Sequence, residues 1–284
     1  MDLASLRLRL GEETLCAFRV SNVFLEQSSG GLRWRMQLDD CSASVIGFTK
    51  HDGVTPSVPE DGDAYLATVS PRLVDDRIYC SILDIWPMSV AIERINALSL
   101  LGRSHCPERA HASLDRLVAL GNSLRTPSMR ELLGRIMSDI NIYPSFLTCR
   151  ASASYHHADR GGLLTHSVDV AFHCADAASR LSPAARDVTI VAGLLHDIGK
   201  LRTVGPGPKR PTEGCWVHHE AVTLEVLAPH MTWLDYEAPK EAAMLRHALT
   251  WYSVKGRGFA QFVGADIVRM ADQIDVAYNL GKTG

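Results

Sequence analysis

The spacing of apolar residues changes near Pro87, and this change divides the chain into two parts with different secondary structure. Over residues 32–38, apolar side chains alternate with Arg33, Arg35 and Gln37, which is the period of two that a half-buried strand requires. After Pro87 the apolar residues recur every three or four positions, which is typical of helices with one buried face. The chain is therefore expected to be multidomain, with strands first and helices afterwards.

Strand-like runs precede Pro87, and residues that favour turns separate them. The runs cover residues 14–25, 32–38, 42–48, 64–69 and 77–86. Short strands with turns between them predict a small barrel or sandwich over residues 1–88.

Helix signals follow one another through the rest of the chain. Thr126 with Pro127 is typical of a helix start, while Gly121 and Gly199 are typical of helix ends. The predicted helices cover residues 107–120, a segment from 126 onward, 163–181, 183–199, 219–227, 240–249 and 264–280. We expect a helical linker region over residues 89–150 that packs on an all-α domain over residues 151–284.

The apolar runs and the cysteines of the sequence indicate the cellular compartment. No run approaches the roughly 20 apolar residues that span a membrane. The first fifteen residues mix charges with leucines, unlike the apolar core of a secretion signal. Seven widely spaced cysteines without a CxxC pair favour free thiols in a reducing compartment. These features predict a cytoplasmic protein with no membrane contact.

A set of histidines and aspartates carries the clearest chemical signal. The doublet His196-Asp197 ends an apolar predicted helix, and His166 lies on the helix before it. The pair His218-His219, then His247 and Asp272, follow on later helices. A helical bundle can turn ligands from separate helices towards its centre. Imidazoles and carboxylates together suit divalent transition metals, and buried ionisable groups are costly unless they are paired or bind a metal.

This order, with GGLLTH before the first histidine and LLHDIGK at the doublet, resembles the HD-domain metal-dependent phosphohydrolases. The segments YHHADRGGLLTHSVDVA, AGLLHDIGKL, RHALTWY and MADQID are similar to YhaM-type 3′–5′ exoribonucleases, and to the HD domain of conjugation-associated relaxases. The segments LRWRMQLDDCSASVIGF and GDAYLATVSPRLVDDRIYCSILDIWPM resemble the OB-fold module of those exonucleases. The resemblance implies a five-stranded OB-like β-barrel followed by an all-α HD-domain helical bundle.

The resemblance also implies one or two divalent metal ions, with Mn²⁺ expected first and Fe²⁺, Mg²⁺, Zn²⁺, Ni²⁺ or Co²⁺ as alternatives. The primary ligands it implies are His166, His196, Asp197 and Asp272. His219, preferred over its neighbour His218, and His247 would complete a second metal site or, around one metal, act on the substrate. Asp197 and Lys200 are the implied catalytic residues, with Lys200 facing the phosphate.

Single-stranded RNA or DNA is the implied substrate, and 3′–5′ exonuclease is the implied activity. The candidate substrate contacts are Lys200, His157, Arg160, Arg33 and Arg35. His157 either contacts the substrate or shapes its loop. Some of the aromatic residues Phe24, Trp34, Phe48, Tyr65 and Tyr79 could stack on bases, although the alternation places Trp34 on the apolar face.

Charge in the N-terminal part argues against this substrate, because residues 1–88 contain eight basic and thirteen acidic side chains. Hydrolysis of small nucleotides by the HD domain therefore stays an alternative. A non-catalytic adaptor of a nucleic-acid processing or conjugative transfer complex is another, and a homo-oligomer stays open. The histidines outside the motif are expected to pack beside it (His173) or to lie at the surface (His51, His105, His111 and His230).

Overall fold

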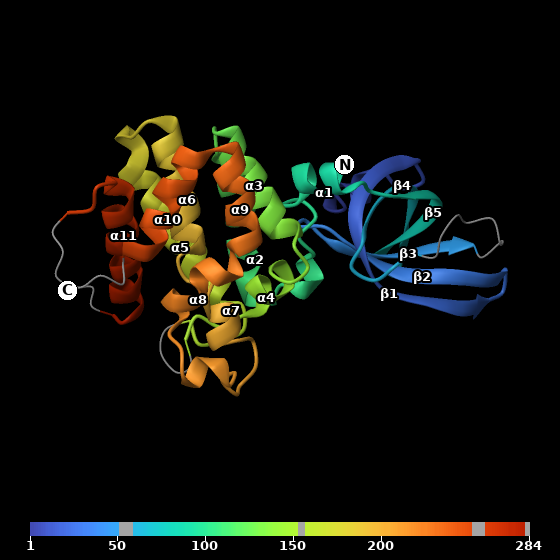
Figure 1. Cartoon of the computed structure of the whole chain (residues 1–284). Coiled ribbons are helices and arrows are strands. Elements are labelled where there is room, and N and C mark those ends of the chain that lie inside the picture. Colours follow the sequence, from blue (N-terminus) through green and yellow to red (C-terminus); the bar gives the residue numbers. More distant parts are fainter. Residues whose placement is uncertain (51–58, 153–156, 252–258, 282–284) are drawn as a thin grey trace. The chain divides into compact units, whose positions relative to one another are not determined.

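The computed structural model in Figure 1 describes residues 1–50, 59–152, 157–251 and 259–281. Contacts between residues divide the chain into two compact units, Met1–His105 and Cys106–Gly284. The finer domain bounds at residues 88 and 150 stay a prediction. Among the described residues, no helix combines the length and apolar character that a membrane span would need.

The first unit is built on a closed five-stranded barrel, as predicted. Its strands are β1 (Thr14–Ser28), β2 (Gly31–Asp39), β3 (Ser44–Lys50), β4 (Ala64–Val74) and β5 (Arg77–Pro87), in the order β1-β2-β3-β5-β4. The first part of β1 pairs with β4 and the rest pairs with β2, so this one strand closes the barrel. A register shift between Ser21 and Phe24 interrupts the pairing of β1 with β2, a few residues after Arg19, the last residue of β1 that pairs with β4.

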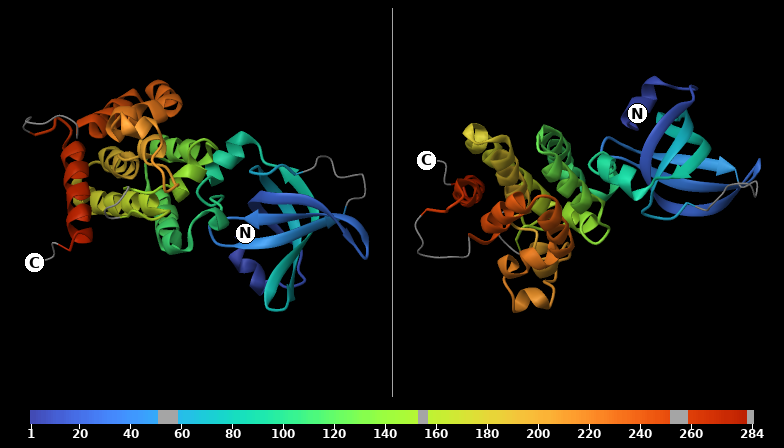
Figure 2. Two further views of the ribbon diagram at one scale, coloured as in Figure 1. Left: turned by 90° about the horizontal axis from the view of Figure 1, so that it is seen from below. Right: turned by 45° about the horizontal axis from the view of Figure 1, so that its top comes forward.

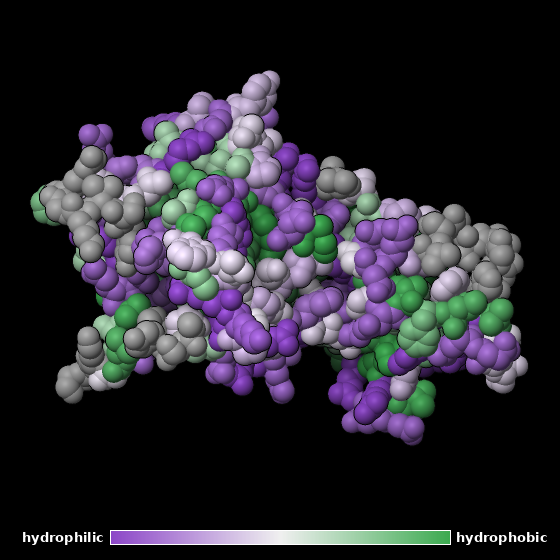
Figure 3. All heavy atoms as spheres, turned by 60° about the horizontal axis from the view of Figure 1, so that its bottom comes forward, coloured by the Kyte–Doolittle hydropathy of each residue, from purple (hydrophilic) through white to green (hydrophobic). Residues whose placement is uncertain are grey.

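Alternation along β2 separates the core of the barrel from its outer face. Met36 and Leu38 are buried in the core, and Trp34 packs against it, while Arg33 and Arg35 belong to the alternate set. Tyr65 is buried in the core, where its hydroxyl accepts the backbone N–H of Glu60, so its suggested role in base stacking is wrong. Large apolar side chains also remain exposed on the barrel, and Figure 3 shows green patches over its strands.

The helix α1 (Val90–Asn96) belongs to the barrel unit. Arg19 on β1 is almost fully buried and pairs with Glu93 of α1 at 2.8 Å. Its guanidinium also donates to the carbonyl of Gly62 at 2.6 Å. This paired and hydrogen-bonded cation fixes α1 to the strands, because an unpaired buried charge would be costly.

The second unit is helical. Its helices are α2 (His111–Ser123), α3 (Pro127–Ser138), α4 (Tyr143–Thr148), α5 (Gly162–Ala177), α6 (Pro183–Leu195), α7 (Lys200–Thr203), α8 (His219–Val226), α9 (Ala228–Glu237), α10 (Pro239–Trp251) and α11 (Val263–Asn279). The nearly continuous apolar sequence of α6 is buried from Asp187 to Leu195. Helices α5, α10 and α11 all contact α6. Figure 2 shows α11, in red, beside α5 and α6.

Several local expectations need correction. Thr126 occupies the predicted N-cap of α3, but its side chain makes no capping bond. Instead, the fully buried carboxylate of Asp187 accepts the backbone N–H groups of Arg125 and Thr126, each at 2.6 Å. The prediction that His230 lies at the surface is wrong, because its buried ring pairs with Asp139 at 3.0 Å.

The other three histidines predicted at the surface differ from one another. His105 is exposed. His111 is half-buried, with its Nε2 atom 3.1 Å from the carbonyl oxygen of Cys106. His51 lies outside the described residues.

Candidate metal centre

Four predicted ligands converge where α5, α6 and α11 meet. His166 lies on the inward face of α5, His196 and Asp197 follow the last residue of α6, and Asp272 lies on α11. His166 is 1% exposed, Asp197 4% and Asp272 8%. Such burial of two carboxylates requires compensating positive charge.

The distances define one common centre. His166 Nε2 lies 3.2 Å from Asp197 Oδ2 and 3.2 Å from Asp272 Oδ1. His196 Nε2 lies 3.4 Å and 3.6 Å from the same two oxygens. Two ring nitrogens and two carboxylate oxygens therefore face each other, which is a donor set suited to a divalent transition metal.

The turn after α6 explains how two adjacent residues can face one centre. Helical neighbours diverge by about 100°, but α6 ends at Leu195, and His196 and Asp197 lie in the turn that follows. Gly199 closes this turn against α8, since a Cβ atom there would lie 2.0 Å from the carbonyl oxygen of His219. The glycine of the HDIGK motif thus permits the close approach that brings His219 to Asp197.

The contact made by Nδ1 of each ring indicates that Nε2 is the nitrogen that faces the centre. His166 Nδ1 lies 2.7 Å from Asp275 Oδ2, and His196 Nδ1 lies 2.8 Å from the carbonyl oxygen of Gly193. Carbonyl and carboxylate oxygens accept hydrogen bonds, so Nδ1 carries a proton in each ring and Nε2 is the nitrogen that faces the centre. His196 Nε2 is buried without a hydrogen-bond partner. Such an orphaned nitrogen fits a metal ligand.

Charges around the centre perturb the ionisation of its members. Burial alone would lower the pKa of His166, but hydrogen bonds to Asp197, Asp272 and Asp275 raise it well above its ordinary value. Burial opposes ionisation of Asp197, yet His196 and Lys200 hold the pKa of that carboxyl well below its usual range. The pKa of Asp272 is lowered in the same way, against its burial, by His166 and His196. A cation at the centre is therefore strongly favoured.

Two histidines were predicted for a second metal. His219 Nε2 lies 2.8 Å from Asp197 Oδ1, so the two oxygens of Asp197 face different imidazoles. Its neighbour His218 is exposed at the N-cap of α8, which agrees with the preference for His219. In the described part of the chain, His247 makes no contact with the side chains of the other predicted ligands. Its ring lies 5.2 Å from that of Trp251, and its Nε2 is buried without a hydrogen-bond partner.

The predicted substrate contacts lie in four different surroundings. Lys200 is at the centre, where its ammonium group pairs with Asp197 Oδ2. His157 lies 3.5 Å from Asp275, behind His166, and Arg160 is exposed beside the Arg109–Asp159 ion pair. On the barrel, Arg33 bonds to Glu26 at 2.7 Å and Arg35 lies 5.1 Å from the centre of the Phe24 ring.

A cavity of about 170 Å³ opens beside the centre. Besides the motif residues, its lining includes two charged side chains that sequence reasoning missed, Glu220 and Arg269. Each had a signal: Glu220 follows His219 directly, and Arg269 precedes Asp272 by three positions and so shares its helix face. Asp275, three positions after Asp272, was missed although the same spacing marks it. The apolar wall consists of Ala248, Leu249, Val268 and Val276.

Comparison with protein families supports the chemistry that this geometry suggests. Residues 163–276 match the family model of the HD domain, and the match contains every predicted metal ligand. HD domains bind divalent metals, and an HD domain implies a metal-dependent phosphohydrolase. Comparison of the chain with curated proteins gives no match. The finer resemblance to YhaM-type exoribonucleases and to relaxases stays a prediction.

Metal binding should release a proton, because the raised pKa of His166 leaves its ring protonated at neutral pH when no metal is present. The metal replaces this proton, so affinity should rise with pH by about tenfold per unit until the pKa of His166 is passed. Titration calorimetry with Mn²⁺ at about pH 6 and about pH 7, in buffers of different ionisation enthalpy, measures both quantities. His173→Gln, which alters another imidazole on α5, should release the same number of protons as wild type. Binding without proton release would contradict this account.

Proposed function

We propose that this chain is a metal-dependent phosphodiesterase that shortens single-stranded RNA or DNA from the 3′ end. One observation carries the hydrolytic part of the proposal. His166, His196, Asp197 and Asp272 face one buried centre, and all four line a cavity of about 170 Å³. The match to the HD domain supports the same chemistry.

A divalent metal would supply the nucleophile from bound water and offset the negative charge that repels attack on a phosphodiester. His166, His196, Asp197 and Asp272 would hold it. Its identity is proposed as Mn²⁺, because a donor set with two imidazoles suits transition metals better than Mg²⁺, which prefers oxygen ligands.

The residues of the chain supply charge and position around the metal. Lys200 and Arg269 are the basic lining residues of the cavity, so they would bind the phosphate oxygens. Lys200 already pairs with Asp197, which keeps its ammonium group at the centre. His219 faces the second oxygen of Asp197, so these two residues would help to hold a second metal, or His219 would contact the substrate directly.

Residues on the outer face of the barrel support the proposal that the substrate is single-stranded. The Phe48 and Tyr79 rings stack with centroids 6.0 Å apart, and the guanidinium of Arg33 lies 3.9 Å from the centre of the Phe48 ring. In the strand register Arg35 lies opposite both Phe24 and Phe48. These residues, which we call the aromatic row, alternate rings and cations across neighbouring strands. Bases stack on such surfaces without regard to sequence.

The excess of acidic side chains in residues 1–88 determines which interaction would give the aromatic row its affinity for a strand. Eight basic side chains against thirteen acidic ones give little attraction to a phosphate backbone. Stacking, rather than charge, would therefore supply most of the affinity of the barrel. The same imbalance favours hydrolysis of small nucleotides as the second candidate function, in which the barrel would not bind substrate.

Purified protein with Mn²⁺ should shorten 5′-labelled oligonucleotides stepwise from their 3′ ends. Asp197→Ala should abolish this cleavage, because it removes the carboxylate that faces three imidazoles and Lys200. Asp176→Ala, which alters an exposed aspartate of α5, is the matched control and should retain full activity. Cleavage of mononucleotides or cyclic dinucleotides alone would favour the second candidate. The absence of hydrolysis with any divalent metal would contradict both and favour an adaptor.

Phe48→Ala should weaken oligonucleotide binding about tenfold, since one stacked base contributes roughly 1–3 kcal/mol. Fluorescence anisotropy with a labelled single strand, without metal, measures the affinity. Tyr236→Ala, an exposed aromatic residue of the helical unit, is the control and should bind as wild type does. We also expect only a shallow loss of affinity with salt. An unchanged affinity for Phe48→Ala would show that the aromatic row does not bind the strand.

A further inference from the structure

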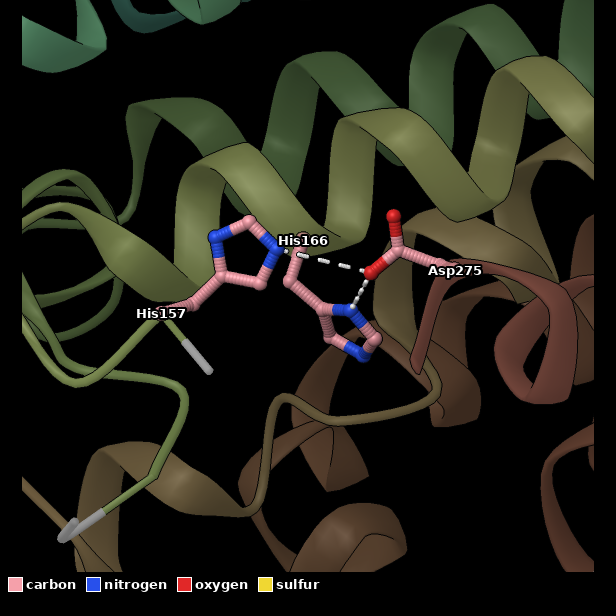
Figure 4. A group of neighbouring side chains, drawn as sticks. All are labelled: His157, His166 and Asp275. Atoms are coloured by element: carbon pink, nitrogen blue, oxygen red, sulfur yellow. Dashed lines mark hydrogen bonds and ion pairs between the residues drawn. The ribbon is translucent and has the colours of Figure 1, made fainter. Parts of the chain in front are cut away.

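A second group of ionisable side chains lies behind His166, on the side away from the four facing atoms. Figure 4 shows His157, His166 and Asp275, with both rings turned towards the Asp275 carboxylate. His166 Nδ1 lies 2.7 Å from Asp275 Oδ2, and His157 Nε2 lies 3.5 Å from the same oxygen. Asp275 is 4% exposed, so its charge is held inside the domain.

This group is better explained as a support for the metal centre than as another metal site. His166 has two ring nitrogens, and its Nε2 already faces Asp197 and Asp272. A second ion on Nδ1 would require the ring to lose both of its protons. A carboxylate that accepts the Nδ1 proton instead fixes the tautomer and the orientation of a metal-binding imidazole.

We propose that Asp275 is a positioning residue that sets the metal affinity of His166, and that His157 holds Asp275 in place. The inference rests on the proposed metal centre and deepens it. Asp272 and Asp275 are three residues apart on α11 and therefore share one face of that helix. One carboxylate faces the metal centre and the other supports an opposing ligand, so the docking of α11 on α5 determines both.

The backbone before α5 places His157 against Asp275. His157 has a φ of 53°, in the left-handed region that few residues other than glycine adopt. Its carbonyl accepts the N–H of Ala151 at 3.0 Å. A Cβ atom at Gly162 would lie 2.0 Å from that carbonyl oxygen, so only glycine allows this approach. Gly161, at the N-cap of α5, itself has a φ of 82°.

The paired glycines Gly161 and Gly162 therefore influence the metal centre without lining it. Neither contributes a side chain to the centre, yet Gly162 is needed for the turn that carries His157, and Gly161 adopts the left-handed φ at which α5 begins. Substitution of Gly162 should move His157 off Asp275 and loosen His166, although every predicted ligand stays intact.

The test measures Mn²⁺ affinity in the full-length protein, from the electron paramagnetic resonance signal of free Mn²⁺. Asp275→Asn should weaken binding about tenfold and Asp275→Ala about a hundredfold, because loss of such a supporting carboxylate typically costs 10–100-fold in affinity. The conservative variant keeps an oxygen acceptor and should therefore retain more affinity. Asp235→Ala, at an exposed aspartate of the same unit, should bind as wild type does.

A spectroscopic readout separates positioning from mere destabilisation. With Co²⁺ at saturation, Asp275→Asn should change the visible absorption bands, since the ring that binds the ion is held differently. Gly162→Ala should lower Mn²⁺ affinity, whereas Gly207→Ala, where a Cβ would meet no atom within 4 Å, should not. His157→Ala should also lower Mn²⁺ affinity. If this variant instead raised KM and left the metal affinity unchanged, His157 would be a substrate contact, and the proposal that His157 holds Asp275 in place would be overturned.

Each remaining outcome is decisive. Wild-type affinity and wild-type Co²⁺ spectra in both Asp275 variants would overturn the proposal. Loss of one of two bound ions, with the other bound as before, would show that the group is a metal site instead. A wild-type protein that binds metal but cleaves nothing would remove the proposed function and leave the positioning role standing. A wild-type protein that binds no metal would overturn both.

Discussion

Three carboxylates surround the buried imidazole of His166, and the helical unit depends on this arrangement. Asp197, Asp272 and Asp275 come from two different segments, and each lies within 3.2 Å of a ring nitrogen of His166. Buried carboxylates repel one another and lose hydration unless positive charge compensates them. The pKa of His166 is raised well above its ordinary value, so a proton on its ring would supply that charge without metal, and a divalent ion would take its place. Metal binding and the assembly of α5, α6 and α11 are therefore coupled.

Backbone constraints make this charge cluster possible. Gly199 permits α8 to approach the turn that carries His196 and Asp197, and Gly162 permits His157 to approach the start of α5. Both glycines lie in motifs that resemble HD-domain phosphohydrolases, although neither contributes a side chain. The proposed metal centre thus depends on two close backbone contacts as well as on its side chains, and Lys200 and Arg269 line the cavity beside the centre.

The fold could be predicted largely from the sequence because periodicity reports burial directly. Alternation around Trp34 predicted β2 and its buried face correctly, and the apolar run before His196 predicted α6. Spacing could not report pairings between distant segments, so His230 was expected at the surface, whereas Asp139 binds it inside. In the site, the motif identified the side chains that face the centre but not Asp275, which contacts His166 on the other side of its ring. Nothing in the sequence places Arg160 relative to the centre, and the structure leaves it exposed.

A crystal structure of the protein with Mn²⁺, with the ion located by its anomalous scattering, tests the central claim most directly. The account predicts an ion in contact with His166 Nε2, His196 Nε2, Asp197 Oδ2 and Asp272 Oδ1, while Asp275 Oδ2 still accepts the Nδ1 proton of His166. An ion bound elsewhere in the chain, or a centre in which His166 turns Nδ1 towards the metal, would contradict it.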